Sequence, residues 1–222
     1  MGKARKPSKD LSDSIFLVVF ATLLIQFFLA YPSFTRPFYQ GNFSWLHVIL
    51  RVGAPTLLMA FFLPFGWRNL GLQWPSLPKK AWIIILGLLA LTTLAVMSTK
   101  FLPDYVGYYQ HMQRGHPWDA FQRFGVFTLS TLIPWEILHR GFLLFGLFYL
   151  LKDHKDLQWV LPICIVAVFE VAFHFTKPYP EALGLLIASP IFSYIGLKSG
   201  SLLVPLLIHL WIEVVFAATM IF

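Results

Sequence analysis

The chain has 222 residues, of which 58% are hydrophobic and 12% are charged, and its formal net charge is +7. Soluble domains carry about 25% charged residues, so this composition excludes an ordinary soluble domain and indicates an integral membrane protein. The basic residues fall mostly between apolar runs, where they set topology and contact lipid headgroups. We therefore expect membrane lipids, and no nucleic acid, among the partners. Cys164 is the only cysteine, which excludes an intrachain disulfide and a cysteine-based metal site.

The amino terminus, residues 1–13, is basic and polar, and an apolar run follows it directly. This order resembles a signal peptide, but the run is long and no clear small-residue cleavage site follows it. We therefore predict a cytoplasmic tail over residues 1–13 and a retained first transmembrane helix.

Seven apolar runs predict an all-α fold, a polytopic transmembrane bundle of about seven segments, in a single domain over residues 14–222. The runs are Ser14–Ala30, Trp45–Leu63, Ala81–Met97, Phe124–Leu151, Trp159–His174, Leu183–Leu197 and Leu202–Phe222. The fourth run is too long for one simple spanning helix, and Pro134 interrupts it. Because proline favours the first turn of a helix, we predict a new helical segment near Trp135, with Glu136 in its first turn.

Loop charge predicts the orientation. With the amino terminus inside, most loop lysines and arginines face the cytoplasm, in agreement with the positive-inside rule. The longest hydrophilic stretch, Lys100–Arg123, is rich in aromatic residues, and we expect it to lie at a membrane interface.

Three of the apolar runs each carry an ionisable pair spaced by four residues, so the two members share a helix face. The pairs are Glu136 with Arg140, Glu170 with His174, and His209 with Glu213. An ionisable residue at a bilayer centre costs about 2.5–3.5 kcal/mol on insertion scales. We therefore expect these side chains to meet inside the bundle, at the functional site.

Each pair has a functional and a structural interpretation. Glu136 could be a water-activating base with Arg140 as its counter-ion, or the two could simply neutralise each other. Glu170 and His174 could share a proton or polarise a water, or His174 could be a solvated residue near the membrane boundary. An internal bond from His209 to its partner glutamate would contribute only about 0.6 kcal/mol in a membrane.

Two further charged residues join the candidates. Arg51, in the second run, could pair with one of the acidic groups, and Glu181 follows the fifth run. The excess of inward glutamates also permits a divalent metal held by His174, His209 and a glutamate. The His-Glu-x-x-His zinc motif is absent, and Ser199-Gly200-Ser201 is not the Gly-x-Ser-Gly of rhomboid-type proteases.

The order of three motifs resembles the CPBP family, which comprises CAAX-type prenyl-protein endopeptidases and bacteriocin-processing or immunity-related proteins, also called the Abi group. The motifs are Glu136-Ile-Leu-His-Arg140-Gly-Phe-Leu, the later histidine His174, and His209 four residues before a polar residue. The resemblance covers about residues 124–222. It implies that Glu136 and Arg140 match the glutamate and arginine of the first motif, and that His174 and His209 match the two histidines. It also implies a bacterial plasma membrane protein.

Three positions depart from the family pattern. Trp135 stands where the family has its first glutamate, Glu170 replaces the phenylalanine of Phe-x-x-x-His, and Glu213 replaces an asparagine or aspartate. A glutamate at the last position cannot donate to an oxyanion unless it is protonated.

The resemblance leads to a first hypothesis, an intramembrane endopeptidase acting on a membrane-associated peptide or protein. In it Glu136 or Glu170 is the base, His174 polarises the water and His209 stabilises the oxyanion. The alternative is a non-catalytic immunity or scaffold protein. A transporter is disfavoured, because no inverted repeat is visible.

Overall fold

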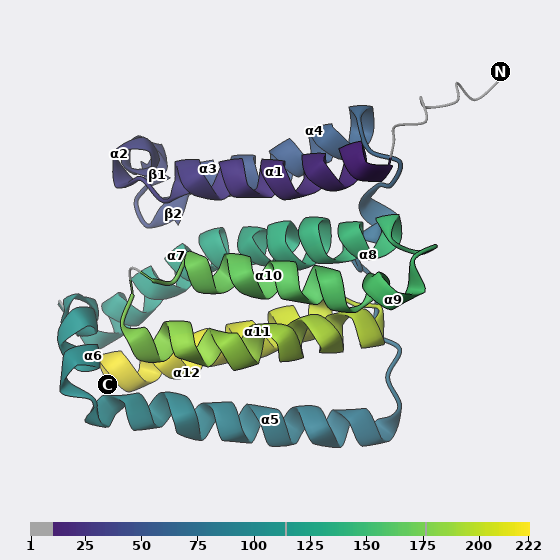
Figure 1. The fold of residues 1–222 in the computed structure, drawn as a ribbon. Coiled ribbons are helices and arrows are strands. Elements are labelled where there is room, and N and C mark those ends of the chain that lie inside the picture. The colour runs from purple at the N-terminus through teal and green to yellow at the C-terminus, as the bar shows by residue number, and fades with distance from the viewer. Residues whose placement is uncertain (1–10, 114, 176) are drawn as a thin grey trace.

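The structure is a computed structural model that describes residues 11–113, 115–175 and 177–222. Most of the predicted tail, residues 1–10, lies outside the described residues, and the first helix begins at Leu11. The fold is all-α, as predicted, apart from one antiparallel pair of two-residue strands, β1 (Tyr39–Gln40) and β2 (Phe43–Ser44). Figure 1 shows the long helices lying side by side along a common direction.

The helices alternate with short connections. The longer ones are α1 (Leu11–Leu29), α5 (Lys79–Ser98), α7 (Pro117–Glu136), α10 (Val160–Ala172), α11 (Tyr179–Ser199) and α12 (Leu203–Ile221). The shorter ones are α2 (Pro32–Thr35), α3 (Trp45–Val48), α4 (Ala54–Phe61), α6 (Pro103–Tyr109), α8 (Gly146–Leu150) and α9 (Lys155–Gln158). Two π-helical segments complete the long runs: η2 (Ile49–Gly53) joins α3 to α4, and η6 (Ile137–Phe145) joins α7 to α8. Short 3-10 turns are η1 (Arg36–Phe38), η3 (Trp67–Asn69), η4 (Thr99–Phe101) and η5 (Gln110–Gln113).

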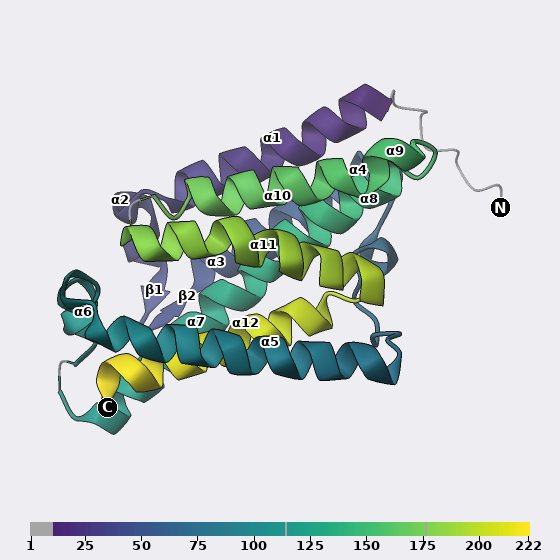
Figure 2. The same ribbon diagram turned by 60° about the horizontal axis from the view of Figure 1, so that its bottom comes forward.

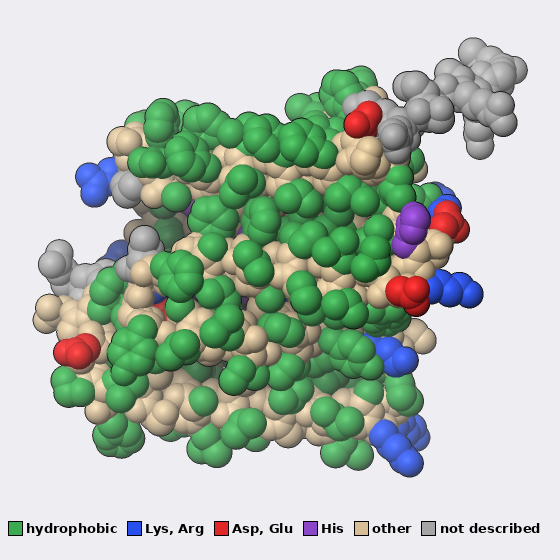
Figure 3. Space-filling model, in the orientation of Figure 1, with side chains coloured by type: hydrophobic (Ala, Val, Ile, Leu, Met, Phe, Trp, Pro, Cys, Tyr) green, Lys and Arg blue, Asp and Glu red, His purple; other side chains and the backbone are tan. Residues whose placement is uncertain are grey.

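Among the described residues, four helices are long and apolar enough to span a membrane: Leu11–Leu29, Lys79–Phe101, Tyr179–Ser199 and Leu203–Ile221. Trp45–Phe61 is a shorter apolar helix. The protein is thus built as a multi-pass membrane protein, while seven segments stay a prediction. Figure 3 agrees, because hydrophobic side chains cover the face in view and charged side chains gather toward the ends of the helices.

The predicted break at Pro134 is wrong. Helix α7 runs through Pro134 and continues without a break as η6 and α8, so Glu136 lies in mid-run rather than in a first turn. A proline in a membrane helix is tolerated where neighbouring groups satisfy the freed backbone. Pro134 lacks the N–H that would donate to the Ser130 carbonyl. Arg51 Nη1 donates to the next carbonyl along the chain, that of Thr131, at 3.0 Å. Instead of a break, the helix widens to π geometry from Ile137, a change that is frequent at functional sites.

The run α7–η6–α8 lies at the centre of the molecule, and α1 and α10 flank it (Figure 2). Every residue of η6 from Leu138 to Phe145 is buried, and the largest hydrophobic cluster packs around it. Helix α5 lies at the edge of the bundle opposite α1 (Figure 1). It packs on α12, and Ile85 is its single buried residue. The most buried helical segment is therefore the one that carries His139 and Arg140.

The connection between α4 and α5 is tied to this centre at Gly71. Its φ is +71°, and an added Cβ would lie 2.6 Å from the Phe145 ring, so only glycine fits. The Leu202 amide donates to the Gly71 carbonyl at 2.7 Å. This contact fixes the start of α12 against η6, and α12 carries His209.

Candidate active site

Glu136 and His209 form the contact at the centre of the site. Glu136 is the last residue of α7 and is fully buried, whereas the His209 side chain, on α12, is 19% exposed. The His209 Nδ1 lies 2.6 Å from Glu136 Oε1. Because the carboxylate oxygen accepts, the histidine must donate from Nδ1, which leaves Nε2 for other contacts. Nε2 lies 3.9 Å from Glu213 Oε1 on the next turn of α12.

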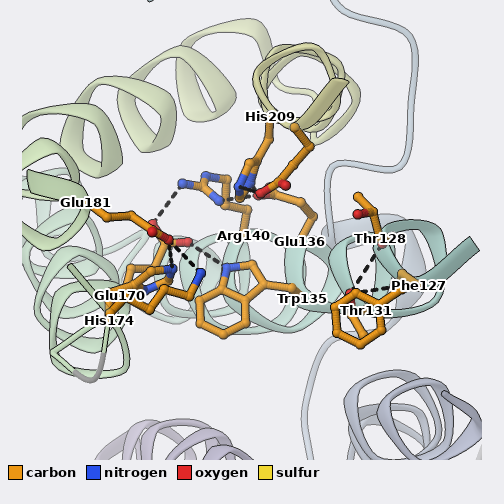
Figure 4. A network of polar contacts seen from close by, with 12 residues as sticks. Phe127, Thr128, Thr131, Trp135, Glu136, Arg140, Glu170, His174, Glu181 and His209 are labelled. Atoms are coloured by element: carbon orange, nitrogen blue, oxygen red, sulfur yellow. Dashed lines mark hydrogen bonds and ion pairs between the residues drawn. The ribbon is translucent and has the colours of Figure 1, made fainter. Parts of the chain in front are cut away.

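Arg140 links two buried carboxylates. Its Nη1 donates to Glu136 Oε1 at 2.5 Å, within one helical run, and its Nη2 donates to Glu170 Oε2 on α10 at 2.9 Å. The three side chains are at most 1% exposed. Two carboxylates therefore share one guanidinium, and Glu136 Oε1 accepts from both Arg140 and His209 (Figure 4).

Glu170 contacts Trp135 rather than the side chain of His174. The Trp135 indole N–H donates to Glu170 Oε1 at 3.1 Å, so each oxygen of Glu170 has one donor. His174 Nδ1 lies 2.6 Å from the backbone carbonyl of Glu170, which accepts its proton. The predicted proton sharing between the Glu170 carboxylate and His174 is thus not present, because the helix turns the imidazole back onto its own backbone. We call Trp135, Glu136, Arg140, Glu170 and His209 the buried cluster.

A second set of polar side chains borders the buried cluster, between the end of α10 and the start of α11. Glu181 accepts from Lys177 Nζ at 2.5 Å and from the Tyr109 hydroxyl at 2.5 Å, and its Oε1 lies 3.7 Å from His174 Nε2. Burial and the Glu181 carboxylate raise the pKa of the Tyr109 phenol above its usual value, so the hydroxyl stays a donor. We call His174, Lys177, Glu181 and Tyr109 the rim; the side chains of His174, Lys177 and Glu181 are 17%, 38% and 21% exposed.

Among the described residues, no acidic side chain pairs with Arg51, so the pairing considered for it is not found. Its Nε and Nη2 donate to Gln26 Oε1 at 3.2 and 2.9 Å, and its guanidinium carbon lies 4.8 Å from the centre of the Trp135 ring. The carboxylates of Glu136 and Glu170 pair with Arg140 instead. Gln26 Nε2 lies 2.9 Å from His139 Nε2, and His139 Nδ1 lies 3.1 Å from the Trp135 carbonyl.

Gln26 was missed by sequence reasoning. The signal was there, because it is the one amide in the apolar run Leu11–Leu29. It is 2% exposed and joins α1 to both π-helical segments, through Arg51 in η2 and His139 in η6.

Several buried polar atoms of this region have no hydrogen-bond partner within the structure. They are Glu136 Oε2, Arg140 Nε, Ser189 Oγ and Ser193 Oγ. Buried polar groups in proteins are nearly always partnered by protein or by ordered water. Glu136 Oε2 and Arg140 Nε therefore mark where water or a polar group of a substrate would bind.

The site residues fall into a connected arrangement. Glu136, Arg140, Glu170 and His209 are joined by direct contacts, whereas His174 reaches them through the Glu170 backbone and the Trp135 ring, at a centroid distance of 5.6 Å. Glu213 lies beside His209 at the open side. Over the described part of the chain, no group of three or more His, Cys, Asp or Glu side chains is arranged to hold a metal ion. The proposed ligand set of His174, His209 and a glutamate does not fit this geometry.

Comparison with known proteins gives a family match for part of the chain. Residues 117–215 match the family model described as type II CAAX prenyl endopeptidase Rce1-like. No curated protein and no solved structure matches the chain. The matched segment begins with α7 and ends within α12, so it contains the whole buried cluster as well as His174 and Glu213. The resemblance to the CPBP family is thereby confirmed: residues 117–215 are a domain of the Rce1-like family of type II CAAX prenyl endopeptidases.

Proposed function

We propose that the protein is an intramembrane endopeptidase that hydrolyses a peptide bond of a membrane-associated substrate with water activated by a glutamate and a histidine. The observation that carries the proposal is the 2.6 Å contact between Glu136 Oε1 and His209 Nδ1. A carboxylate that accepts from Nδ1 orients the imidazole and leaves Nε2 as a basic nitrogen. The partial exposure of His209 lets that nitrogen reach a water, while Glu136 stays buried.

The geometry supports the following sequence of steps. His209 Nε2 takes a proton from a water while the water oxygen attacks the substrate carbonyl, and Glu136 stabilises the imidazolium that forms. The proton then passes from His209 to the amine that leaves. Arg140 keeps Glu136 in place, and His174 Nε2 offers a second acceptor at the rim to hold the water. In this scheme His209 acts as the base beside Glu136 rather than as an oxyanion donor. Its Nδ1–H already donates a hydrogen bond to the carboxylate and is not available to an oxyanion.

The test is a cleavage assay with purified protein and a panel of prenylated and unprenylated membrane peptides. Glu136→Gln, His209→Ala and His174→Ala should each lower the rate about 100-fold or more, the usual size of a general acid–base contribution. Asp153→Asn and His154→Ala are matched controls, because both residues are exposed in the turn before α9. The controls should cleave as the wild type does. Retained activity in all three site variants would refute the assignment.

A non-catalytic role is the second candidate, and one observation favours it. Glu136, Arg140 and Glu170 form an ion-pair network with at most 1% exposure, and a purely structural network can have the same burial and pairing. In that case no peptide of the panel is cleaved by the wild type, and conservative swaps within the network leave its biological function intact. A gain of cleavage in Trp135→Glu would instead mark the natural chain as a weakened enzyme in which the tryptophan does not support catalysis.

A further inference from the structure

Trp135 sits where two parts of the site meet. It is next to Glu136 in the chain, yet its indole N–H points to Glu170 on α10 (Figure 4). The Glu170 carboxylate thus has a neutral donor on Oε1, at 3.1 Å, and the charged Arg140 on Oε2, at 2.9 Å. The two departures from the family pattern noted in the sequence, at positions 135 and 170, are therefore one contact between two helices.

The indole is held from several sides. The His139 ring lies at a centroid distance of 4.0 Å, the Arg51 guanidinium at 4.8 Å, and His174 packs edge-on at 5.6 Å. Arg51 and His139 are in turn held by Gln26. Such a constrained ring has little freedom to turn, so its N–H has a fixed direction. A donor fixed by packing is the arrangement that orients a functional group within a fraction of an ångström.

The orientation of Glu170 matters because Arg140 serves two carboxylates. Arg140 holds Glu136 by Nη1 and Glu170 by Nη2 at the same time, so the position of Glu170 affects the position of the guanidinium. The indole N–H keeps Oε1 of Glu170 turned toward Trp135 and so presents Oε2 to Arg140. Without the indole donor, Glu170 could rotate and draw Arg140 away from Glu136, which orients His209.

We propose that Trp135 is a positioning residue of this site, which acts through Glu170 and Arg140 to hold Glu136 and His209 in their working geometry. The inference rests on the proposed function. If the contact is what matters, tryptophan and glutamate can exchange places between positions 135 on α7 and 170 on α10, because the two side chains contact each other.

The first experiment measures the contact without using activity. The protein is labelled with ¹⁵N in its eight tryptophans, and the indole N–H signals are recorded in detergent micelles. The Trp135 signal is assigned from its loss in Trp135→Phe. Glu170→Gln should shift this signal and leave that of Trp211 in place, since the Trp211 indole donates to Thr93 instead, at 2.9 Å. An unmoved Trp135 signal would overturn the contact.

The second experiment measures turnover. Trp135→Phe keeps a ring but removes the N–H, and we expect kcat to fall about tenfold with KM within about twofold, as for lost transition-state positioning. Trp211→Phe removes an indole donor outside the site and should retain the wild-type kcat. An unchanged kcat in Trp135→Phe would overturn the positioning role while leaving the proposed function intact.

A double variant that exchanges Trp135 and Glu170 separates loss of the contact from loss of folding. Trp135→Glu and Glu170→Trp should each lower kcat about 100-fold, whereas the double exchange should recover to within about tenfold of the wild type. A double exchange no more active than the single variants, in a protein that still shows its native melting transition, would contradict the inference. A wild-type protein without any activity would overturn the proposed function, and with it the catalytic part of this inference, while the indole signal still tests the contact.

Discussion

At the scale of single residues, Arg140 carries the charge balance of the site. It is 1% exposed, and its two terminal nitrogens donate to carboxylates that come from different helices. A planar guanidinium can bridge two acceptors in this way, whereas an ammonium is a single point charge. Removing one partner of a buried ion pair leaves an uncompensated charge, which costs far more than the pair itself contributes.

We therefore expect Arg140→Met to lower the free energy of unfolding by about 3–5 kcal/mol, because it leaves two buried carboxylates without their cation. Thermal or detergent-induced unfolding of the purified protein measures this change. Arg68→Met is the control, because Arg68 is exposed in the connection between α4 and α5. An equal effect of the two substitutions would show that the network does not stabilise the fold.

At the scale of elements, α6 is held over the site by its tyrosines. Tyr105 and Tyr109 pack against Phe216 and Met220 of α12, and the Tyr109 hydroxyl donates to Glu181 of α11. The predicted interfacial stretch Lys100–Arg123 is thus largely helical and covers the end of α11 and α12 that carries the rim. The hydrogen bond from Tyr109 therefore joins α6 to Glu181, whose carboxylate also lies close to His174.

Tyr109→Phe removes that bond and keeps the ring packing. We expect amide hydrogens of α6 to exchange about fivefold faster, since a net hydrogen bond contributes about 1 kcal/mol and the free energy of local opening falls by that amount when the bond is lost. Hydrogen exchange followed by mass spectrometry measures this in peptides that cover α6. Tyr179→Phe is the control, because Tyr179 is 73% exposed at the start of α11. Equal exchange in both variants would mean that the bond does not hold α6.

At the scale of the whole molecule, charge is distributed unevenly between the two ends of the bundle. At the end of the bundle where α9 is found lie η3, the start of α5, the turn after α8 and the end of α11 (Figure 1). These segments and α9 carry Arg68, Lys79, Lys80, Lys152, Lys155 and Lys198, whereas the rim lies at the end where α6 is found. By the positive-inside rule, the end with α9 should face the cytoplasm. The predicted orientation therefore places the rim on the opposite side of the membrane.

Thiol labelling in intact cells tests this orientation. Cys164 is exposed and is first replaced by alanine, and single cysteines are then introduced as His116→Cys, before α7, and Lys155→Cys, in α9. A membrane-impermeant maleimide should label position 116 in intact cells and position 155 only after permeabilisation. Both should react equally in detergent. The reverse pattern would place the amino terminus outside.

The sequence by itself determined the membrane class and the all-α fold, because long apolar runs must form helices in lipid. It also indicated the residue types of the candidate site, because an ionisable group inside a membrane costs free energy and is rarely kept without a functional reason. The spacing of Glu136 and Arg140 was enough to predict one ion pair, since four residues along a helix bring side chains together. Only the tertiary structure decided which groups meet across helices: Glu136 with His209, Glu170 with Trp135, and Arg51 with Gln26. These contacts depend on how α1, α7, α10 and α12 rotate against one another, and on the widening of the helix after Pro134. Helix periodicity predicts which residues share a face of one helix, but it does not predict which face of a neighbouring helix packs against them.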